Sequence, residues 1–217
     1  MRTPLRLLVA SGALVGALVA TAAPAQASGQ VVIDEGHVDV IGVAYEDGEL
    51  NLHIHDESVE PGVEREPGEV KFQVKPEAET TVPANPAYSF LGNAGDPVWI
   101  LPQVQNPDLV WAGFGTEEIE LGVFQNDQVK VTFWVAAGPG DLAIYTENSF
   151  GLPSSILVDT GDGLPDTVTL SAGDHTHANW AFDAPGHYWL VVTATGKLAG
   201  SGQTVVDAGL YHFQVLS

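Results

Sequence analysis

The chain has 217 residues, with 28 Asp and Glu against 7 Lys and Arg, and its formal net charge is −21 at pH 7. This charge argues against nucleic acid or an anionic membrane surface as a partner, because both would repel the protein. The sequence contains no cysteine, so neither disulfides nor thiolate ligands contribute to it. Cations are the favoured partners, although acidic surfaces also keep exported proteins soluble.

The first 27 residues have the three parts of a secretory signal peptide. A short basic start precedes an apolar stretch over residues 7–23, and Ala25-Gln26-Ala27 follows as an A-x-A cleavage site. The apolar stretch is too short and too weakly flanked for a membrane anchor. We therefore predict a secreted protein, cleaved after Ala27 and not inserted in the membrane afterwards. Residues 28–217 are predicted to form a single β-domain with an ample core.

Residues 31–55 predict a strand followed by a β-hairpin. The segments 31–33, 37–45 and 50–55 have strand patterns, and Asp47-Gly48 separates the last two. An Asp-Gly pair between alternating strands is the strongest short-range signal for a hairpin with a two-residue turn.

A two-residue turn also fixes how the hairpin strands pair. It would place Gly42 opposite His53 and Val40 opposite His55, with both histidines turned away from the apolar core face. His37 and Asp39 fall on the core-face parity of their strand. A β-bulge would therefore be needed to bring His37 round to the histidine pair.

The middle of the chain is less regular. Residues 56–68 are predicted to form an acidic loop, and 70–74 a strand. Residues 76–115 are rich in Pro, Asn and aromatic residues and predict a long irregular segment, broken by a strand at 98–101. Residues 116–119 begin with Thr and two Glu, which predicts one helical turn with Thr116 as its N-cap.

The last third returns to short strands separated by Gly- and Pro-containing turns. Together with the hairpin, this pattern predicts an all-β fold, namely an antiparallel β-sandwich or jelly roll with a long irregular middle segment and at most one short helix. The predicted strands are 129–136, 142–145, 168–170, 177–182, 187–195 and 209–215.

Two histidine pairs of the form His-x-His lie at residues 53–55 and 175–177. In a strand, residues two apart share one face, so each pair presents two imidazoles side by side, and imidazole is a standard zinc ligand. If the two strands were neighbours, they would form a site with four His, or three His and an acid, for a divalent transition metal, with zinc favoured. The alternative is polar residues on solvated faces. The candidate ligands are His53, His55, His175 and His177, with His37 and Asp39 as possible additions; Asp56 and Asp174 are further carboxylates nearby.

Aromatic residues are a further set of candidate binding residues. Trp99 and Trp111 lie in the irregular middle segment with Gln103 and other amides, a composition that could line a groove for a sugar or peptide. A packed loop is the default interpretation. The other tryptophans, Trp134, Trp180 and Trp189, lie in strand patterns and are predicted to be core residues.

The acidic segment 159–166 has the sequence DTGDGLPD. It resembles a calcium loop, but its spacing does not match an EF-hand, which requires a bidentate Glu at the twelfth position. A turn rich in Asp and Gly is the favoured interpretation.

Several motifs occur together in a characteristic order. They make the chain similar to the actinobacterial surface-anchored protein domain, also called the choice-of-anchor M domain, over nearly all of residues 28–217. The similarity is most specific over about 168–216, the repeat that defines that family. The motifs are GHVD at 36–39, YSFLG at 88–92, VWILPQ at 98–103, GPG at 138–140, HTHANWAF at 175–182 and APGHY at 184–188.

This resemblance implies a protein at the cell surface. Members of the family are exported, and some are encoded beside ABC transporters of the zinc and manganese type. The resemblance therefore implies a secreted binding module that captures a divalent transition metal, or a related solute. Its partner would be the solute-binding component of an ABC transporter or a cell-wall protein.

Two other classes of function stay open. The first is a metal-free module for cell-wall or surface interaction and adhesion. The second is a cupin-like metalloenzyme, because cupins also present two metal ligands as His-x-His on a strand. The glutamate expected a few residues after His177 is missing, and metal catalysis needs a positioned acid or base. We therefore do not expect an enzyme.

Overall fold

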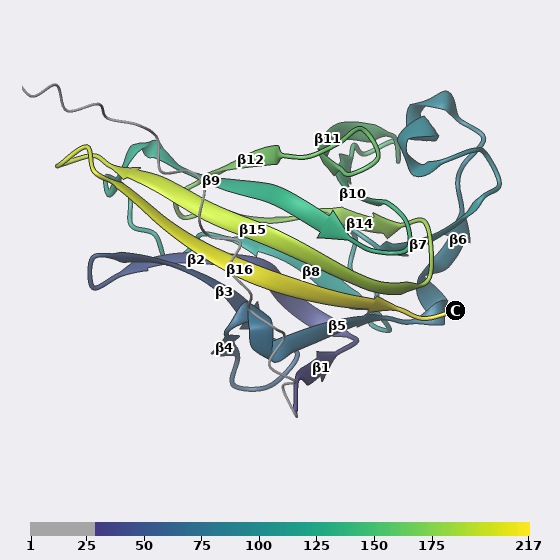
Figure 1. The fold of residues 1–217 in the computed structure, drawn as a ribbon, viewed down its shortest axis with the longest axis horizontal. Coiled ribbons are helices and arrows are strands. Elements are labelled where there is room, and N and C mark those ends of the chain that lie inside the picture. The colour runs from purple at the N-terminus through teal and green to yellow at the C-terminus, as the bar shows by residue number, and fades with distance from the viewer. Residues whose placement is uncertain (1–28) are drawn as a thin grey trace, which may run out of the picture.

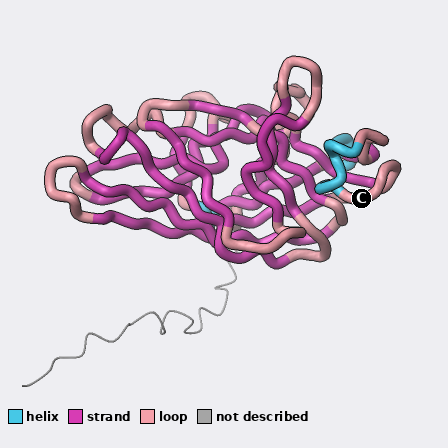
Figure 2. Tube along the Cα trace, turned by 90° about the horizontal axis from the view of Figure 1, so that it is seen from above, coloured by secondary structure: helices cyan, strands magenta, loops and turns pink. Residues whose placement is uncertain are grey.

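The computed structural model describes residues 29–217, so the predicted signal peptide lies outside the described residues. Strands dominate the structure (Figure 2). They make up 58% of it and helix only 6%, which confirms the all-β prediction. The helical residues form three short 3₁₀ helices, η1 (Pro67–Glu69), η2 (Pro76–Ala78) and η3 (Pro86–Leu91). Within residues 29–217, no helix has the length and apolar character needed to span a membrane.

The strands form three sheets, in which most neighbours are antiparallel and the pairs β1–β5, β5–β16 and β2–β8 are parallel. The first sheet has the order β1 (Val31–Ile33), β5 (Val70–Val74), β16 (Thr204–Val215), β15 (Gly186–Leu198), β9 (Phe124–Ala137) and β12 (Asp166–Ser171). The second has the order β11 (Pro153–Asp159), β10 (Leu142–Glu147), β14 (Asn179–Phe182), β7 (Pro97–Leu101) and β6 (Glu79–Thr81). The third has the order β13 (His175–His177), β8 (Val110–Gly115), β2 (Gly36–Glu46), β3 (Glu49–Asp56) and β4 (Val63–Arg65).

The first sheet packs against the other two as a sandwich. Figure 1 shows its long strands β9, β15 and β16 side by side, and β3 of the third sheet packs against β15 and β16. An aromatic cluster joins all three sheets. Trp180 of β14 is fully buried and stacks on Phe114 of β8 and Phe213 of β16, with ring centroids 5.7 and 5.5 Å apart. Such large rings dominate the energetics of a core.

The hairpin β2–β3 has the predicted turn. Asp47 and Gly48 have φ values of 51° and 88°, as a two-residue turn with two left-handed residues requires, and Gly42 pairs with His53. The predicted partner of His55 is wrong, because Asp39 lies opposite it in place of Val40. The register shifts between Asp39 and Gly42, where a β-bulge inserts an extra residue. This bulge turns Asp39, and His37 two residues before it, to the face of β3 that carries the histidines.

The structure corrects the prediction for the middle and last thirds. The segment predicted to be irregular contains two additional strands, β6 and β8, the predicted acidic loop contains β4, and β11 was not predicted. The strand predicted at 177–182 is divided: β13 belongs to the third sheet and β14 to the second, with Ala178 between them.

Residues 116–119 form a single turn without a helix. The Ile119 N–H donates to the Thr116 carbonyl oxygen over 3.0 Å, which closes the turn. The Thr116 hydroxyl donates to the Ser171 carbonyl and accepts from the Asp174 N–H, so it ties the turn to the segment before β13 and does not act as an N-cap.

The predicted core position of two tryptophans is wrong. Trp180 is buried, but Trp134 is 51% exposed and Trp189 is 36% exposed. On β15 the alternation turns Tyr188 and Leu190 inward, and Trp189 therefore lies on the outer face, where its ring stacks on His212 at 3.7 Å.

Candidate metal centre

The third sheet carries histidines from both predicted pairs. Strands β13 and β3 are not neighbours, because β8 and β2 lie between them. No site of four histidines is therefore formed from the two pairs. Instead, the potential ligands form two groups on adjoining strands, as listed here: His37, Asp39, His175 and His177 in the first group, and His53, His55 and Glu118 in the second.

The ligand atoms of the first group are closely spaced. The Nε2 atom of His37 lies 3.1 Å from that of His175 and 3.2 Å from that of His177. The Nε2 atoms of His175 and His177 are 3.1 Å apart. The Asp39 Oδ1 atom lies 3.1 Å from His175 Nε2 and 3.9 Å from His37 Nε2. A tetrahedral zinc ion with bonds of about 2.0–2.1 Å separates its ligands by about 3.3–3.4 Å, so these spacings fit one such ion.

Hydrogen bonding alone does not account for three imidazole nitrogens at such short mutual distances. Each Nε2 atom carries either a proton or a lone pair, so among three atoms at least two must be of the same kind and repel each other. A cation that accepts all three lone pairs removes this conflict. The buried Asp39 Oδ1 atom, although 3.1 Å from His175 Nε2, also makes no hydrogen bond among the described residues. A buried charged atom without a partner is costly.

Glycines on β8 leave the space that the first group occupies. A Cβ atom added at Gly113 would collide with Asp39 Oδ1 and come within 3.0 Å of His177 Cε1, and one at Gly115 would lie 2.5 Å from Asp39 Oδ2. Glycine in the interior of a strand weakens it and often marks a site of close approach. Here the two glycines let side chains from β2 and β13, on either side of β8, meet above it.

Neighbouring side chains orient the imidazoles. Trp111 stacks on His177 with centroids 3.6 Å apart and an angle of 7°, and its Nε1–H donates to the Gln103 carbonyl oxygen over 2.8 Å. The Nδ1 atom of His37 contacts Glu57, and that of His175 lies 3.2 Å from a Glu117 oxygen. Carboxylates on the second nitrogen fix the ring orientation and raise the basicity of metal-bound histidines.

The predicted groove residues therefore have other positions. Trp111 and Gln103 support the first group, whereas Trp99 is only 4% exposed and packs in the main core. Of the other nearby carboxylates, Asp56 pairs with Arg65 over 2.7 Å, and Asp174 accepts from the His175 N–H. Neither belongs to the two groups.

Burial controls the charge of two members of the first group. It lowers the pKa of His177 to about 4, so this imidazole is neutral at neutral pH, as a metal ligand must be. Burial raises the pKa of Asp39 above its usual value, and His175 and His37 partly oppose that shift. The protein thus does not fully compensate the negative charge of the Asp39 carboxylate. A bound cation would supply the missing compensation.

The second group lies beside the first. Its Glu118 Oε1 atom is 3.7 Å from His53 Nε2 and 3.5 Å from His55 Nδ1. A cleft of about 180 Å³ opens here, lined by both histidines and by the turn that follows β8. Sequence reasoning missed Glu57, Glu117 and Glu118. Glu57 directly follows β3, but the other two follow a strand that the sequence did not predict.

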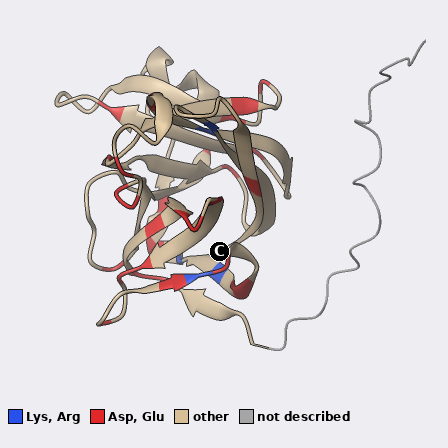
Figure 3. Cartoon of the chain, turned by 90° about the vertical axis from the view of Figure 1, so that its left-hand side faces the viewer, with Lys and Arg blue, Asp and Glu red and all other residues tan. Residues whose placement is uncertain are grey.

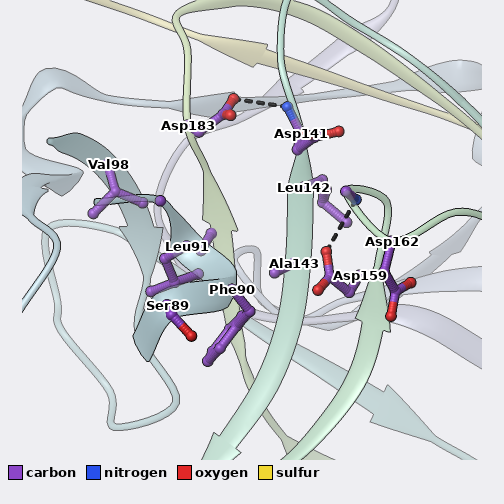
Figure 4. Close-up of a pocket in the computed structure, with 13 residues that line it drawn as sticks. Ser89, Phe90, Leu91, Val98, Asp141, Leu142, Ala143, Asp159, Asp162 and Asp183 are labelled. Atoms are coloured by element: carbon purple, nitrogen blue, oxygen red, sulfur yellow. Dashed lines mark hydrogen bonds between the residues drawn. The ribbon is translucent and has the colours of Figure 1, made fainter. Parts of the chain in front are cut away.

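A separate cavity of about 320 Å³ lies between η3 and β10 (Figure 4). Asp183 accepts from the Asp141 N–H over 2.7 Å, and Asp159 accepts from the Gly161 N–H over 3.0 Å. Burial raises the pKa of both accepting carboxyls. These carboxylates organise turns, in agreement with the interpretation of residues 159–166 as a turn.

Comparisons of the chain with models of protein families, with curated proteins and with solved structures found no match.

Proposed function

We propose that this chain is an extracytoplasmic binding module that holds one divalent transition metal ion, with zinc favoured, at His37, Asp39, His175 and His177. The triangle of three Nε2 atoms with mutual distances of 3.1–3.2 Å carries the proposal. Neutral imidazoles and one carboxylate in tetrahedral spacing suit zinc better than manganese or magnesium, which prefer octahedral oxygen sites.

Four protein ligands favour holding the ion over catalysis. Catalytic zinc sites usually have three protein ligands and leave the fourth position to water or substrate. The secreted location rests on the signal-peptide pattern of the sequence. Delivery of the ion to the solute-binding component of an ABC transporter, or to a cell-wall protein, rests on the resemblance to the surface-anchored domain, and it is the part of the proposal that a partner-binding assay must test.

The direct experiment is a thermal melt of the metal-free protein with and without zinc, manganese or copper. A ligand that binds only the folded state at a hundredfold excess over its Kd stabilises it by about 2.7 kcal/mol. We expect zinc to raise the Tm of the parent and to have a much smaller effect on His175→Ala/His177→Ala. His187→Ala changes an exposed histidine on the first sheet and is the matched control. An equal shift in the double variant would reject these ligands.

A metal-free surface-interaction module is the second candidate. The outer face of the first sheet exposes Trp134, Trp189, Val191 and Leu210. Grouped apolar side chains on a surface often mark an interaction site. Binding to isolated cell walls that is lost in Trp134→Ser/Trp189→Ser, and unchanged by a zinc chelator, would favour this candidate.

A further inference from the structure

We infer that His53, His55 and Glu118 form a second divalent-cation site, separate from the first and more open to solvent. The inference deepens the proposed function. It rests on that function in one respect, because the charge balance of the two groups includes one ion at the first site.

The separations in the second group are too long for hydrogen bonds and suitable for shared ligation. His53 Nε2 and His55 Nδ1 lie 3.7 and 3.5 Å from the same Glu118 oxygen. A tetrahedral zinc ion with bonds of about 2.0–2.2 Å separates its ligands by about 3.3–3.6 Å, close to these two distances. The three ligand atoms all lie within 4.8 Å of one another, so one ion between them can approach all three.

The surroundings of His53 support this assignment. Its side chain is 5% exposed, its Nδ1 atom has no hydrogen-bond partner among the described residues, and its Nε2 atom lies 3.7 Å from Glu118, beyond hydrogen-bond length. Buried polar groups nearly always have a partner, and an ion between His53 Nε2 and Glu118 would provide one for that nitrogen. A Cβ atom at Gly42, the pairing partner of His53, would lie 2.6 Å from His53 Nε2. Glycine at this position thus leaves room for the ring to reach towards Glu118.

The charges around the two groups favour more than one divalent ion. Acidic side chains outnumber basic ones throughout the molecule (Figure 3). Four carboxylates approach the histidines of the two groups, and within residues 29–217 none of them pairs with Lys or Arg; they are Asp39, Glu57, Glu117 and Glu118. A single divalent ion would leave two negative charges uncompensated. A second ion balances all four, and this offsets the repulsion between the two ions.

The second group is also the more accessible one. The side chains of His55 and Glu118 are 33% and 31% exposed, and both line the cleft of about 180 Å³. Three protein ligands leave a coordination position for water or a small anion. We therefore expect the second ion to bind more weakly and to exchange faster than the first. Glu57 contacts both His37 and His55, so the two groups share a carboxylate along which an ion could pass.

Calorimetric titration of the metal-free full chain with zinc tests the inference. We expect two equivalents with different affinities. Glu118→Gln should weaken the second equivalent at least tenfold and leave the first, whereas His175→Ala should remove the tight equivalent and leave the weaker one. Glu120→Gln, a change at a nearby exposed position, is the matched control and should retain both. Circular dichroism of each variant checks that its fold is retained.

The outcomes separate the two proposals. A single equivalent that is lost in His175→Ala and retained in Glu118→Gln would overturn the second site and leave the proposed function intact. A single equivalent that is lost in Glu118→Gln and retained in His175→Ala would support the second site and overturn the first as the principal one. No binding in the parent would overturn both.

Discussion

Asp39 on β2 lies directly opposite His55 on β3, although the alternation of the hairpin would place Val40 there. The bulge that causes this shift buries both Val40 and Ile41 and leaves Asp39 on the histidine face. As a result, Asp39 of the first group also lines the cleft of the second group. Burial raises the pKa of Asp39, and histidines of both groups partly oppose that shift.

Gly113→Ala should weaken zinc binding at the first site at least tenfold. The added Cβ would collide with Asp39 and press on His177, so at least one ligand must move. A ligand displaced by several tenths of an ångström no longer fits the tetrahedral spacing. Calorimetry measures the zinc affinity of this variant. The matched control is Gly200→Ala, where an added Cβ meets nothing within 4 Å. Equal affinities in the two variants would show that the glycine is not needed for the site.

Trp111→Leu should lower both stability and zinc affinity. The indole stacks on His177 and anchors to Gln103, and such aromatic contacts contribute about 0.5–1.5 kcal/mol beyond their buried area. Trp134→Leu removes an exposed indole on the first sheet and serves as the control. Urea unfolding without metal, followed by zinc titration, separates the two effects. If the affinities of the two variants agree, Trp111 is a packing residue only.

Zinc affinity should fall as the pH decreases, because protons compete for the ligand nitrogens. Burial holds the pKa of His177 at about 4, so this ligand is already neutral across the range from pH 5.5 to 7.5. Proton release on binding at the first site should therefore stay at or below two per ion, although three imidazoles bind. Titrations of Glu118→Gln in buffers of different ionisation enthalpy measure this number. A value near three would contradict the burial of His177.

The stability of the metal-free protein should also fall as the pH drops from about 6.5 towards 4. Burial lowers the pKa of His212 to about 4, with smaller contributions from His187 and Lys71. Between these pH values the unfolded chain binds a proton that the folded protein excludes, so protonation favours unfolding. His212 should contribute about 2 kcal/mol of lost stability between pH 7 and 5. His177 acts in the same direction.

His212→Phe keeps a flat ring against Trp189 and cannot titrate. Urea unfolding at pH 7 and 5 in the presence of a chelator should show a smaller pH-dependent loss in this variant than in the parent. The same loss in both proteins would assign the effect to other groups.

Local patterns were sufficient for most of the fold. Alternation and turn residues predicted the all-β class, the Asp47-Gly48 hairpin and most long strands. They could not predict β8, because its two glycines disfavour a strand by propensity. Those glycines leave room for side chains of the neighbouring strands β2 and β13. A local sequence pattern gives no information about such neighbours. The sequence also indicated that a bulge was needed, but its position depends on which side chains the core accepts.

The candidate ligands were predictable as residues but not as a group. His37, Asp39, His175 and His177 were all named from spacing and motif. Their association depends on the order β13–β8–β2–β3, which brings together residues 138 positions apart in the chain. Periodicity within a segment contains no information about such distant pairing. The division of the segment 175–182 between two sheets was missed for the same reason.

The strand β13 has only three residues and pairs with β8 alone, at the edge of its sheet. An ion at the first site would tie this short edge segment to the first hairpin of the fold and close a loop of more than a hundred residues. In a protein without cysteine, that is the topological equivalent of a disulfide. In the chain-entropy treatment of cross-links, closing a loop of this size stabilises the folded state by about 4–5 kcal/mol. Unlike a disulfide, this cross-link could be made and broken by the supply of metal, without any redox reaction.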